Sequence, residues 1–324
     1  MRPEPHNCKL QMAGTAPFDR PYVGRFAPSP TGDLHFGSMI AAVGSYLQAR
    51  KSGGVWRVRI EDLDPPREVP GAAERQLHTL ARFGLVPDGA VERQSQLQTR
   101  YQRVLKGLLE RGDAFPCACT RADLPASGIY PGTCRRGMPA DHPARSIRFR
   151  VSDNDMVFHD GVQGMQRHNP ARQCGDFVIR RADGLVAYQL AVVVDDGVAG
   201  VSEVVRGADL IDSTARQIQL QRALALPQPA YAHLPLIVDS RGRKLSKSQG
   251  DDPIDRLPAA DTLRLVLRAL GHEPPRGVKS LDAVWRWAAG SWNLGQIPRG
   301  PISIAVQGGV DGDYTQLHDA AQQI

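Results

Sequence analysis

Apolar residues in the first part of the chain fall into two spacings, one typical of strands and one of helices. Short apolar-rich runs predict strands, whereas Met39, Val43 and Leu47 recur with the spacing of one helix face. Two strands and three helices are predicted here, at Tyr22–Ala27, Phe36–Ala49, Val55–Ile60, Gly71–Phe83 and Gln96–Arg111. A strand, a turn, a helix and a second strand in this order indicate a parallel, doubly wound α/β sheet.

The pattern changes near residue 115. From there to about residue 150 the chain carries cysteines, prolines and glycines without a sustained period, which predicts an inserted subdomain. Apolar runs then resume at Phe177–Ile179, Val186–Val194 and Val201–Val205. We interpret Asp195 and Asp196 as a turn at the end of a strand. The remaining predicted elements are helices near Thr214–Leu224, Ala259–Leu270 and Leu281–Ala289 and a strand near Leu234–Val238.

Composition excludes several classes of protein. With 324 residues, 41% hydrophobic and 23% charged, the chain can bury one substantial core and a smaller unit. No run of 18 apolar residues occurs and the first 20 residues do not read as a secretory signal, so we expect a cytoplasmic protein without membrane association. The net charge of +6 fits a polyanionic partner. Three of the five cysteines lie within 18 residues, which favours a metal site over disulfides.

The turn after the first predicted strand has the features of a phosphate site. A helix N-terminus presents unpaired N–H groups and the positive end of its dipole to an anion. At this helix start, Gly37 lets a nucleotide approach the backbone, Ser38 follows it, and His35 can donate to a phosphate. A loop about 200 residues later carries Lys244 and Lys247, which can neutralise a triphosphate. Each motif alone also fits a plain helix start or a basic surface loop.

Four blocks together resemble the glutamyl group of class I aminoacyl-tRNA synthetases, over about residues 22–290. They read RFAPSPTGDLHFGS, RIEDLD, VRGADL and KLSKS, at Arg25–Ser38, Arg59–Asp64, Val205–Leu210 and Lys244–Ser248. The first is similar to the "HIGH" region, with Ser38 in place of its last histidine, and the last to the "KMSKS" loop. The resemblance implies a Rossmann-type catalytic domain that uses ATP with Mg²⁺. It assigns catalysis to His35, Lys244 and Lys247, and ATP binding to His35, Gly37, Ser38 and Lys247.

The resemblance also implies a pocket for glutamate. A specific pocket needs cationic donors for two carboxylates and an acceptor for the ammonium. Arg25 and Arg206 are expected to hold the carboxylates, Glu61 the ammonium, and Tyr188 to supply a hydroxyl and a wall. The full set implied by the resemblance is Arg25, Phe26, Ala27, Pro28, Ser29, Glu61, Tyr188 and Arg206. The expected reaction is attack of the glutamate carboxylate on the α-phosphorus of ATP, without a protein nucleophile.

The cysteines near residue 120 are candidate metal ligands. Thiolates favour zinc, and four protein ligands indicate a structural site, although reduced thiols without a metal are the alternative. The short relatives of glutamyl-tRNA synthetase carry a zinc set of three cysteines and a tyrosine in this region. The matching positions here are Cys117, Cys119, Tyr130 and Cys134.

These features divide the chain into six segments. We expect a disordered extension at 1–20, two halves of the catalytic domain at 21–114 and 176–240, and the zinc-type insertion at 115–175. The KLSKS loop and a short helical stem-contact unit follow at 241–292, and a weakly structured tail at 293–324.

The length of the chain after the KLSKS loop distinguishes between members of the glutamyl group. Only 76 residues follow Ser248, too few for the large anticodon-binding region of a conventional glutamyl-tRNA synthetase. The chain therefore resembles the truncated paralogues, which transfer activated glutamate to the queuosine base in the anticodon of tRNA(Asp). The implied partners are glutamate and the tRNA(Asp) anticodon stem-loop, bound by a monomer. The alternatives are a truncated glutamyl-tRNA synthetase that charges the 3′ end of tRNA(Glu), and a non-catalytic glutamate or nucleotide sensor.

Overall fold

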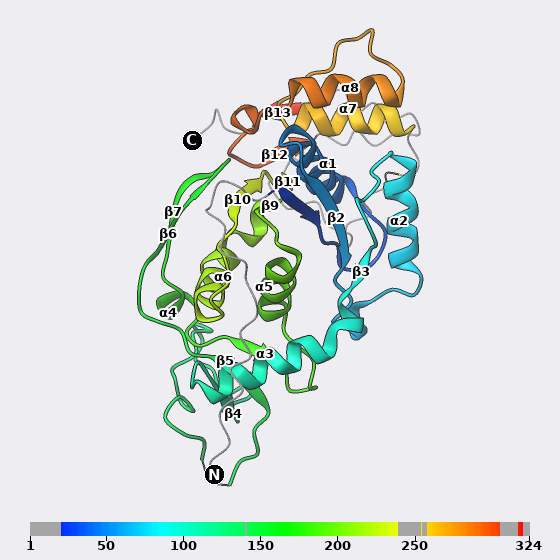
Figure 1. Ribbon diagram of the computed structural model, residues 1–324. Helices are drawn as coiled ribbons and strands as arrows, with labels where there is room; N and C mark the ends of the chain where they lie inside the picture. The colour runs from blue at the N-terminus through cyan, green and yellow to red at the C-terminus, as the bar shows by residue number, and fades with distance from the viewer. Residues whose placement is uncertain (1–20, 140, 239–253, 255–257, 305–316, 320–324) are drawn as a thin grey trace.

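The computed structural model describes residues 21–139, 141–238, 254, 258–304 and 317–319 (Figure 1). The predicted extension at 1–20 and both predicted catalytic lysines, Lys244 and Lys247, lie outside the described residues.

The central sheet is built around β1 (Val23–Phe26), which lies between β2 (Val55–Ile60) and β9 (Glu203–Gly207). On one side β1, β2 and β3 (Glu92–Arg93) pair in parallel, and on the other β9 pairs in parallel with β10 (Ala230–Leu234). The Ser202 N–H donates to the Val23 carbonyl and the Val23 N–H donates to Ser202 Oγ, both at 2.9 Å, and these bonds join the two halves. The predicted α/β fold with a parallel sheet is confirmed.

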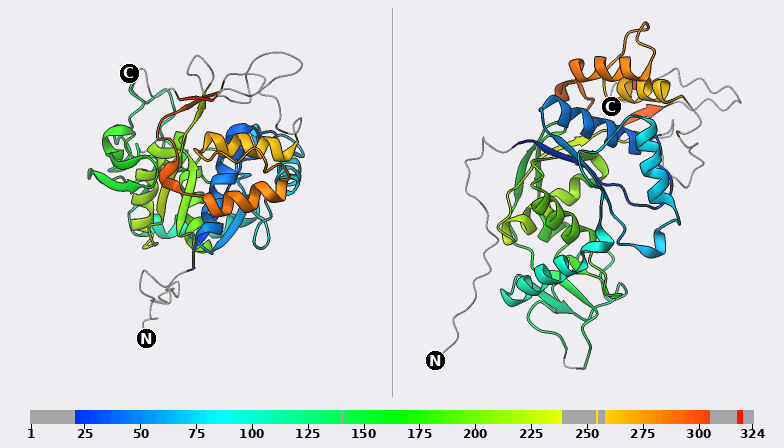
Figure 2. Two further views of the ribbon diagram at one scale, coloured as in Figure 1. Left: turned by 90° about the horizontal axis from the view of Figure 1, so that it is seen from above. Right: turned by 45° about the vertical axis from the view of Figure 1, so that its right-hand side comes forward.

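The helix α1 (Phe36–Lys51) is enclosed by the rest of the domain. It lies directly on β10, since a Cβ at Gly44 would lie 2.6 Å from Leu234 Cδ1. On its other side it is covered by α7 (Ala259–Ala269) and α8 (Leu281–Ser291), as both views of Figure 2 show. The largest core cluster therefore runs from the sheet through α1 into these two helices.

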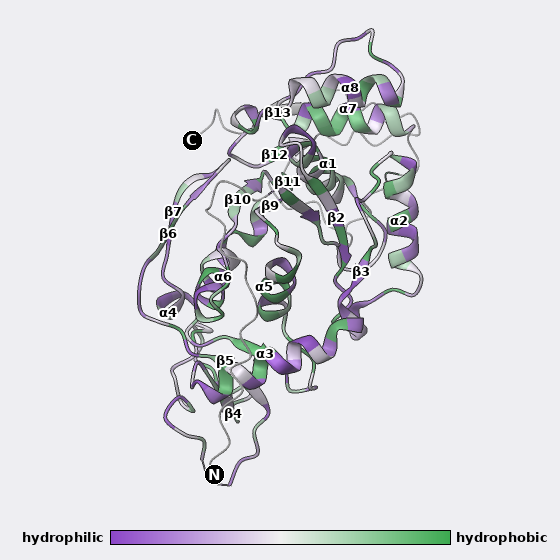
Figure 3. Ribbon diagram, viewed as in Figure 1, coloured by the Kyte–Doolittle hydropathy of each residue, from purple (hydrophilic) through white to green (hydrophobic). Residues whose placement is uncertain are grey.

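A second core lies below the parallel sheet in Figure 1. It is formed by α3 (Gln98–Glu110), α5 (Tyr188–Ala199) and α6 (Ile211–Ala223), together with an antiparallel sheet of β4 (Ala114–Cys117), β5 (Ser146–Phe149) and β8 (Val178–Arg180). Figure 3 shows that α5 is largely hydrophobic, whereas α3 carries residues of both kinds. Further elements are α2 (Ala72–Arg82), α4 (Pro170–Gln173) and 3₁₀ turns at Pro65–Arg67, Gln94–Leu97, Ala208–Leu210 and Leu294–Gln296.

The strand interpretation of Val186–Val194 is wrong, because the helix α5 begins at Tyr188 and only Val186 forms a β-bridge, with Arg180. Apart from Tyr188 and Gln189 the run is apolar, so few polar positions mark its period, and burial on all sides hides the difference between strand and helix. The helix ends at Gly200, which has a left-handed φ of 68°. Asp195 and Asp196 therefore lie in the buried last turns of a helix rather than in a turn after a strand.

The structure contains strands in two segments where no strand was predicted, the insertion and the tail. The hairpin of β6 (Met156–Asp160) and β7 (Gly164–His168) lies within the range expected to be inserted, yet β6 pairs with β10 through Asp160 and Tyr231. Within the tail, β12 (Ile302–Ile304) pairs with β11 (Ile237–Val238) and with β13 (Leu317–Asp319). Among the described residues, no helix is long and apolar enough to cross a membrane.

Candidate active site

A cavity of about 370 Å³ opens at the carboxyl ends of the parallel strands. It lies beside β1, where the strand order reverses, and this is the place where doubly wound sheets bind ligands. Its walls come from the segment after β1, the start of α1, and the ends of β9 and β10. They include Phe26, Pro28, Ser29, His35, Gly37, Ser38, Gln76 and Gly207.

The start of α1 is shaped by a reciprocal cap between His35 and Ser38. His35 Nδ1 accepts from the Ser38 N–H at 3.3 Å, and the His35 N–H donates to Ser38 Oγ at 3.4 Å. Because Nδ1 accepts, the ring proton is on Nε2, which is then a donor. A Cβ at Gly37 would lie 3.0 Å from His35 Cε1, so glycine leaves room for the ring. A donor and a helix N-terminus thus border the cavity.

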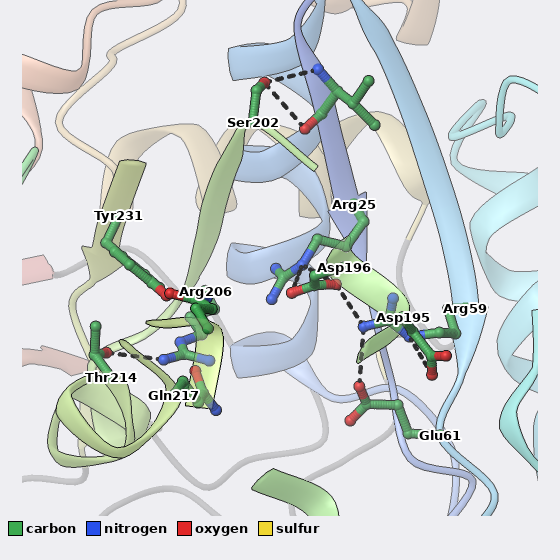
Figure 4. Close-up of polar contacts among 12 residues, drawn as sticks. Arg25, Arg59, Glu61, Asp195, Asp196, Ser202, Arg206, Thr214, Gln217 and Tyr231 are labelled. Atoms are coloured by element: carbon green, nitrogen blue, oxygen red, sulfur yellow. Dashed lines mark hydrogen bonds and ion pairs between the residues drawn. The ribbon is translucent and has the colours of Figure 1, made fainter. Parts of the chain in front are cut away.

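Buried charges link Arg25 of β1 to α5 (Figure 4). Arg25 Nε donates to both oxygens of Asp196 at 3.2 and 3.3 Å, and Arg59 Nη2 donates to Asp196 Oδ1 at 2.8 Å. Burial favours the neutral form of Asp196, but the charges of Arg25 and Arg59 outweigh it and hold its pKa below the usual value. The carboxylate therefore stays ionised and holds both arginines.

Asp195 secures the same cluster from the adjacent position. It is fully buried and accepts from Tyr101 OH at 2.6 Å, from Gln94 Nε2 at 2.9 Å and from Arg100 Nη1 at 2.9 Å. Arg59 Nε lies 3.9 Å from its Oδ2. The two aspartates thus connect β2, α3 and α5 around one buried arginine.

Glu61 lies at the edge of this cluster, directly after β2. Its Oε1 is 3.4 Å from Arg59 Nη2, and burial raises its pKa to about 7 despite the nearby arginines. Burial likewise raises the pKa of Tyr188, and the charges of Arg206, Glu61 and Arg25 all act on its phenol. Tyr188, Arg206, Glu61 and Arg25, all predicted for the glutamate pocket, are therefore close neighbours.

Arg206 of β9 faces the cluster from the other side (Figure 4). Its Nε donates to His233 Nε2 at 3.0 Å, and its Nη2 donates to Thr214 Oγ1 at 2.8 Å and to the Leu210 carbonyl at 3.3 Å. Its Nη1 is buried and has no partner in the part of the chain that the structure describes. A buried guanidinium nitrogen without an acceptor is costly, and an anionic ligand would satisfy it.

The structure therefore brings the predicted pocket residues to one place. Phe26, Pro28 and Ser29 line the cavity, and Ala27 is half-buried between them at the end of β1. Sequence reasoning missed Arg59, Asp195, Asp196, Thr214 and His233. For Arg59 a signal existed, because it lies two residues before Glu61 and thus points to the same side of the strand.

The predicted metal ligands also come together, in the subdomain that contains β4. The sulfurs of Cys117, Cys119 and Cys134 lie within 4.8 Å of one another, with Cys119 and Cys134 3.7 Å apart. The Tyr130 hydroxyl is 3.5 Å from Cys117 Sγ and accepts from the Cys134 N–H at 2.8 Å. A tetrahedral zinc ion places its ligand atoms about 3.5–3.8 Å apart. The donor set therefore fits a metal ion.

Arg148 of β5 supports this cluster electrostatically. Its Nε donates to Cys117 Sγ at 3.3 Å and its guanidinium lies 3.9 Å above the Tyr130 ring. Burial alone would raise the pKa of Cys117, but hydrogen bonding with Tyr130 and Arg148 outweighs it and lowers the pKa to about 7. A thiolate is therefore available to a cation near neutral pH.

Comparison with known proteins agrees with this architecture. The family model of the catalytic domain of class I tRNA synthetases for E and Q matches residues 22–127 and 134–270. A glutamate tRNA ligase from Elizabethkingia meningosepticum, solved in complex with its amino acid, superposes with a TM-score of 0.75 and is 27% identical. That match covers 88% of this chain and 67% of the ligase. The fold and the site thus define a class I tRNA synthetase.

Relatives that match over nearly their whole length identify the family within this class. The glutamyl-Q tRNA(Asp) synthetase of Chromobacterium violaceum is 49% identical over 290 residues, which cover 87% of this chain and 97% of the relative. That of Pseudomonas aeruginosa PAO1 is 52% identical over 281 residues, which cover 86% and 96%. The chain belongs to the glutamyl-Q tRNA(Asp) synthetase family.

Proposed function

We propose that this protein activates glutamate with ATP and transfers it to the queuosine base in the anticodon of tRNA(Asp). Relatives that match this chain over nearly their whole length carry the name of that activity. The observation that carries the amino-acid part is the buried Nη1 of Arg206, which has no partner among the described residues and lies close to Arg25 and Glu61. Because tRNA is a cytoplasmic molecule, the proposed reaction takes place in the cytoplasm.

The pocket residues have complementary roles in this proposal. Arg25 and Arg206 hold the carboxylates of glutamate, ionised Glu61 accepts from its ammonium, and Tyr188 provides a wall and a hydroxyl. An oxygen of the α-carboxylate forms a bond to the α-phosphorus of ATP. At the same time the bond from that phosphorus to the bridging oxygen breaks, and pyrophosphate leaves. The glutamyl group then passes from the adenylate to queuosine, and AMP is released.

ATP is proposed to occupy the cavity at the start of α1. Two donors there suit its phosphates, namely His35 Nε2 and the helix N-terminus that Gly37 leaves accessible. Class I synthetases use ATP with Mg²⁺, which neutralises phosphate charge. Lys244 and Lys247 are proposed to join this site.

The cysteine cluster is proposed to hold a structural zinc ion. Cys117, Cys119, Cys134 and Tyr130 supply four donors, and zinc with three thiolates leaves a net negative charge that Arg148 balances. The proposed zinc would fix the loop between β4 and β5.

The test locates transferred glutamate on the tRNA. The protein is incubated with ATP, labelled glutamate and tRNA(Asp) that contains or lacks queuosine, and nuclease fragments are then analysed. We expect label in the anticodon fragment of queuosine-containing tRNA alone. Label at the 3′-terminal adenosine contradicts the proposed acceptor, and absence of glutamate-dependent pyrophosphate exchange contradicts activation. As matched variants, His35→Gln should lose most of the exchange, whereas exposed His159→Gln should retain it.

A further inference from the structure

Three adjacent strands carry a buried chain of hydrogen bonds that ends at Arg206. Asp160 closes β6, His233 lies on β10 and Arg206 lies on β9. Asp160 Oδ2 is 2.5 Å from His233 Nδ1, and His233 Nε2 accepts from Arg206 Nε at 3.0 Å. The three residues are 1%, 0% and 5% exposed, so these hydrogen bonds are shielded from solvent.

The hydrogen-bond partners determine which atom of His233 carries the proton. Asp160 Oδ1 accepts three backbone N–H groups, from Val162, Gln163 and His233, at 2.8–3.0 Å, and such a group remains an ionised acceptor. His233 Nδ1 therefore donates to Asp160, which leaves the Nε2 lone pair facing Arg206. A neutral His233 of this tautomer is the only form that can accept from Arg206 Nε.

These bonds leave one part of the Arg206 guanidinium for a ligand. The Nε hydrogen is used by His233, and Nη2 by Thr214 and the Leu210 carbonyl. Nη1, with two hydrogens, is buried without a described partner. The fixed donors thus set both the plane of the guanidinium and the direction in which Nη1 points.

We propose that Asp160 and His233 are positioning residues that aim Arg206 Nη1 at a carboxylate of the amino-acid substrate. Through this aim they set the preference for glutamate over glutamine. The inference rests on the proposed activation of glutamate. An arginine presents only N–H donors, so it can donate to either oxygen of a carboxylate, whereas it can donate to only one end of an amide and repels the NH₂ at the other end. Discrimination between glutamate and glutamine requires that the guanidinium of Arg206 keeps a fixed orientation, with Nη1 facing the substrate.

Asp160→Asn is the sharpest test because it changes the tautomer with almost no change in shape. The asparagine oxygen can still accept the backbone N–H groups, but its NH₂ faces His233 Nδ1 and forces that atom to accept. The ring proton then moves to Nε2, where it opposes the Arg206 Nε–H. A buried Asp–His pair that orients a third group loses function in the same way when the aspartate becomes asparagine.

The experiment combines binding with a direct view of the histidine. Labelled glutamate and labelled glutamine are titrated by equilibrium dialysis against the full chain, and KM for glutamate and for ATP are measured by pyrophosphate exchange. Histidine-labelled protein gives the tautomer from ¹⁵N NMR, with the His233 signal assigned by its loss in His233→Gln. Asp155→Asn, an exposed change just before β6, is the matched control.

In Asp160→Asn we expect the His233 proton to move to Nε2 and KM for glutamate to rise at least about tenfold, with KM for ATP within about twofold. The preference for glutamate over glutamine should fall by a similar factor. Unchanged KM for glutamate with a changed tautomer overturns the proposal, as does a wild-type proton on Nε2. If the wild type itself binds no glutamate, the proposed function fails instead.

A second pair of variants keeps the test valid if Asp160→Asn does not fold. His233→Leu removes the acceptor and should weaken glutamate binding, whereas the amide oxygen of His233→Gln can still accept from Arg206 Nε and should restore part of it. Equal glutamate affinity in these two variants, with equal melting temperatures, overturns the positioning role.

Discussion

Asp196 illustrates how one residue determines the state of several others. Its carboxylate is shared by Arg25 and Arg59, both almost fully buried, and it neutralises charge that the interior could not otherwise accommodate. From the sequence alone, Asp196 was interpreted as a turn residue. Its partner Arg25 is 171 positions away, so the ion pair could not be recognised. The pattern of neighbours in a sequence cannot reveal a counter-ion at that separation.

Asp196→Asn should therefore destabilise the fold as well as the pocket. Loss of one partner of a buried ion pair leaves an unpaired charge and costs about 3–5 kcal/mol. Urea denaturation measures this change in the free energy of unfolding. Asp183→Asn, which removes an exposed carboxylate beside Arg181, is the control and should cost less than about 1 kcal/mol. Equal losses in the two variants would contradict the buried-pair interpretation.

Glutamate affinity should depend on pH through Glu61. Burial raises the pKa of Glu61 to about 7, so the carboxyl gains a proton as the pH falls through that value. The protonated form cannot pair with the ammonium of glutamate, so the dissociation constant should rise about fivefold between pH 7 and pH 6. Calorimetric titration at several pH values measures it. Glu61→Gln should bind weakly at every pH, and a persistent pH dependence in that variant assigns the effect to another group.

At the scale of elements, the start of α1 connects backbone geometry with the cavity. The ring of His35 lies over Gly37 and is fixed by Ser38, so the helix cap also orients the donor that faces the cavity. The cap and the proposed ATP contact are thus made by the same side chain.

Gly37→Ala should displace the His35 ring while it preserves the helix. The added Cβ would lie 3.0 Å from Cε1 of the ring, closer than side chains normally approach. We expect KM for ATP to rise several-fold in pyrophosphate exchange. Alanine also stabilises a helix relative to glycine by up to about 1 kcal/mol, and Gly290→Ala in α8 is the control for this effect. A Cβ at Gly290 meets nothing within 4 Å, so this variant should leave KM for ATP unchanged. Wild-type KM for ATP in Gly37→Ala contradicts the role of the ring.

Elements with a clear period could be predicted from the sequence, whereas a mostly apolar run without one could not. The strand at Val55–Ile60 was predicted with its observed bounds, and α1 with an end two residues short. The helix α5 was missed because apolar residues occupy most of Tyr188–Val194 and leave too few polar positions to mark a helical period. The residues that the resemblance assigns to the pocket lie together in the structure, whereas the residues that hold them, such as His233 and Asp160, belong to no recognisable motif. Their role depends on strand order, which is set by tertiary packing.

At the scale of the molecule, the cysteine subdomain is spatially separate from the cavity. Its own small core contains Phe115, Cys117, Tyr130 and Cys134 and is distinct from the core around α1. The proposed zinc should therefore stabilise this part of the chain more than the amino-acid pocket.

Cys134→Ser should lower bound zinc and loosen the subdomain. Removal of one thiolate from a four-donor site weakens metal affinity and exposes the loop between β4 and β5. Metal content by mass spectrometry and amide exchange of β4 measure these effects. Cys174→Ser is the matched control because Cys174 lies outside the metal cluster. Equal zinc content in both variants contradicts the assignment, and glutamate affinity should change little in either.

The ion pair between Arg25 and Asp196 also has a consequence for how the protein is made. The two residues are separated by 171 positions, and Arg206 follows later still. During synthesis on the ribosome, the early part of the chain emerges with Arg25 and Arg59 but without Asp195 and Asp196, which pair with them in the folded protein. The amino-acid pocket can therefore assemble only after the chain has been translated beyond β9, and contacts at such separation form slowly. Glutamate is consequently a ligand of the finished fold and cannot assist its earlier steps.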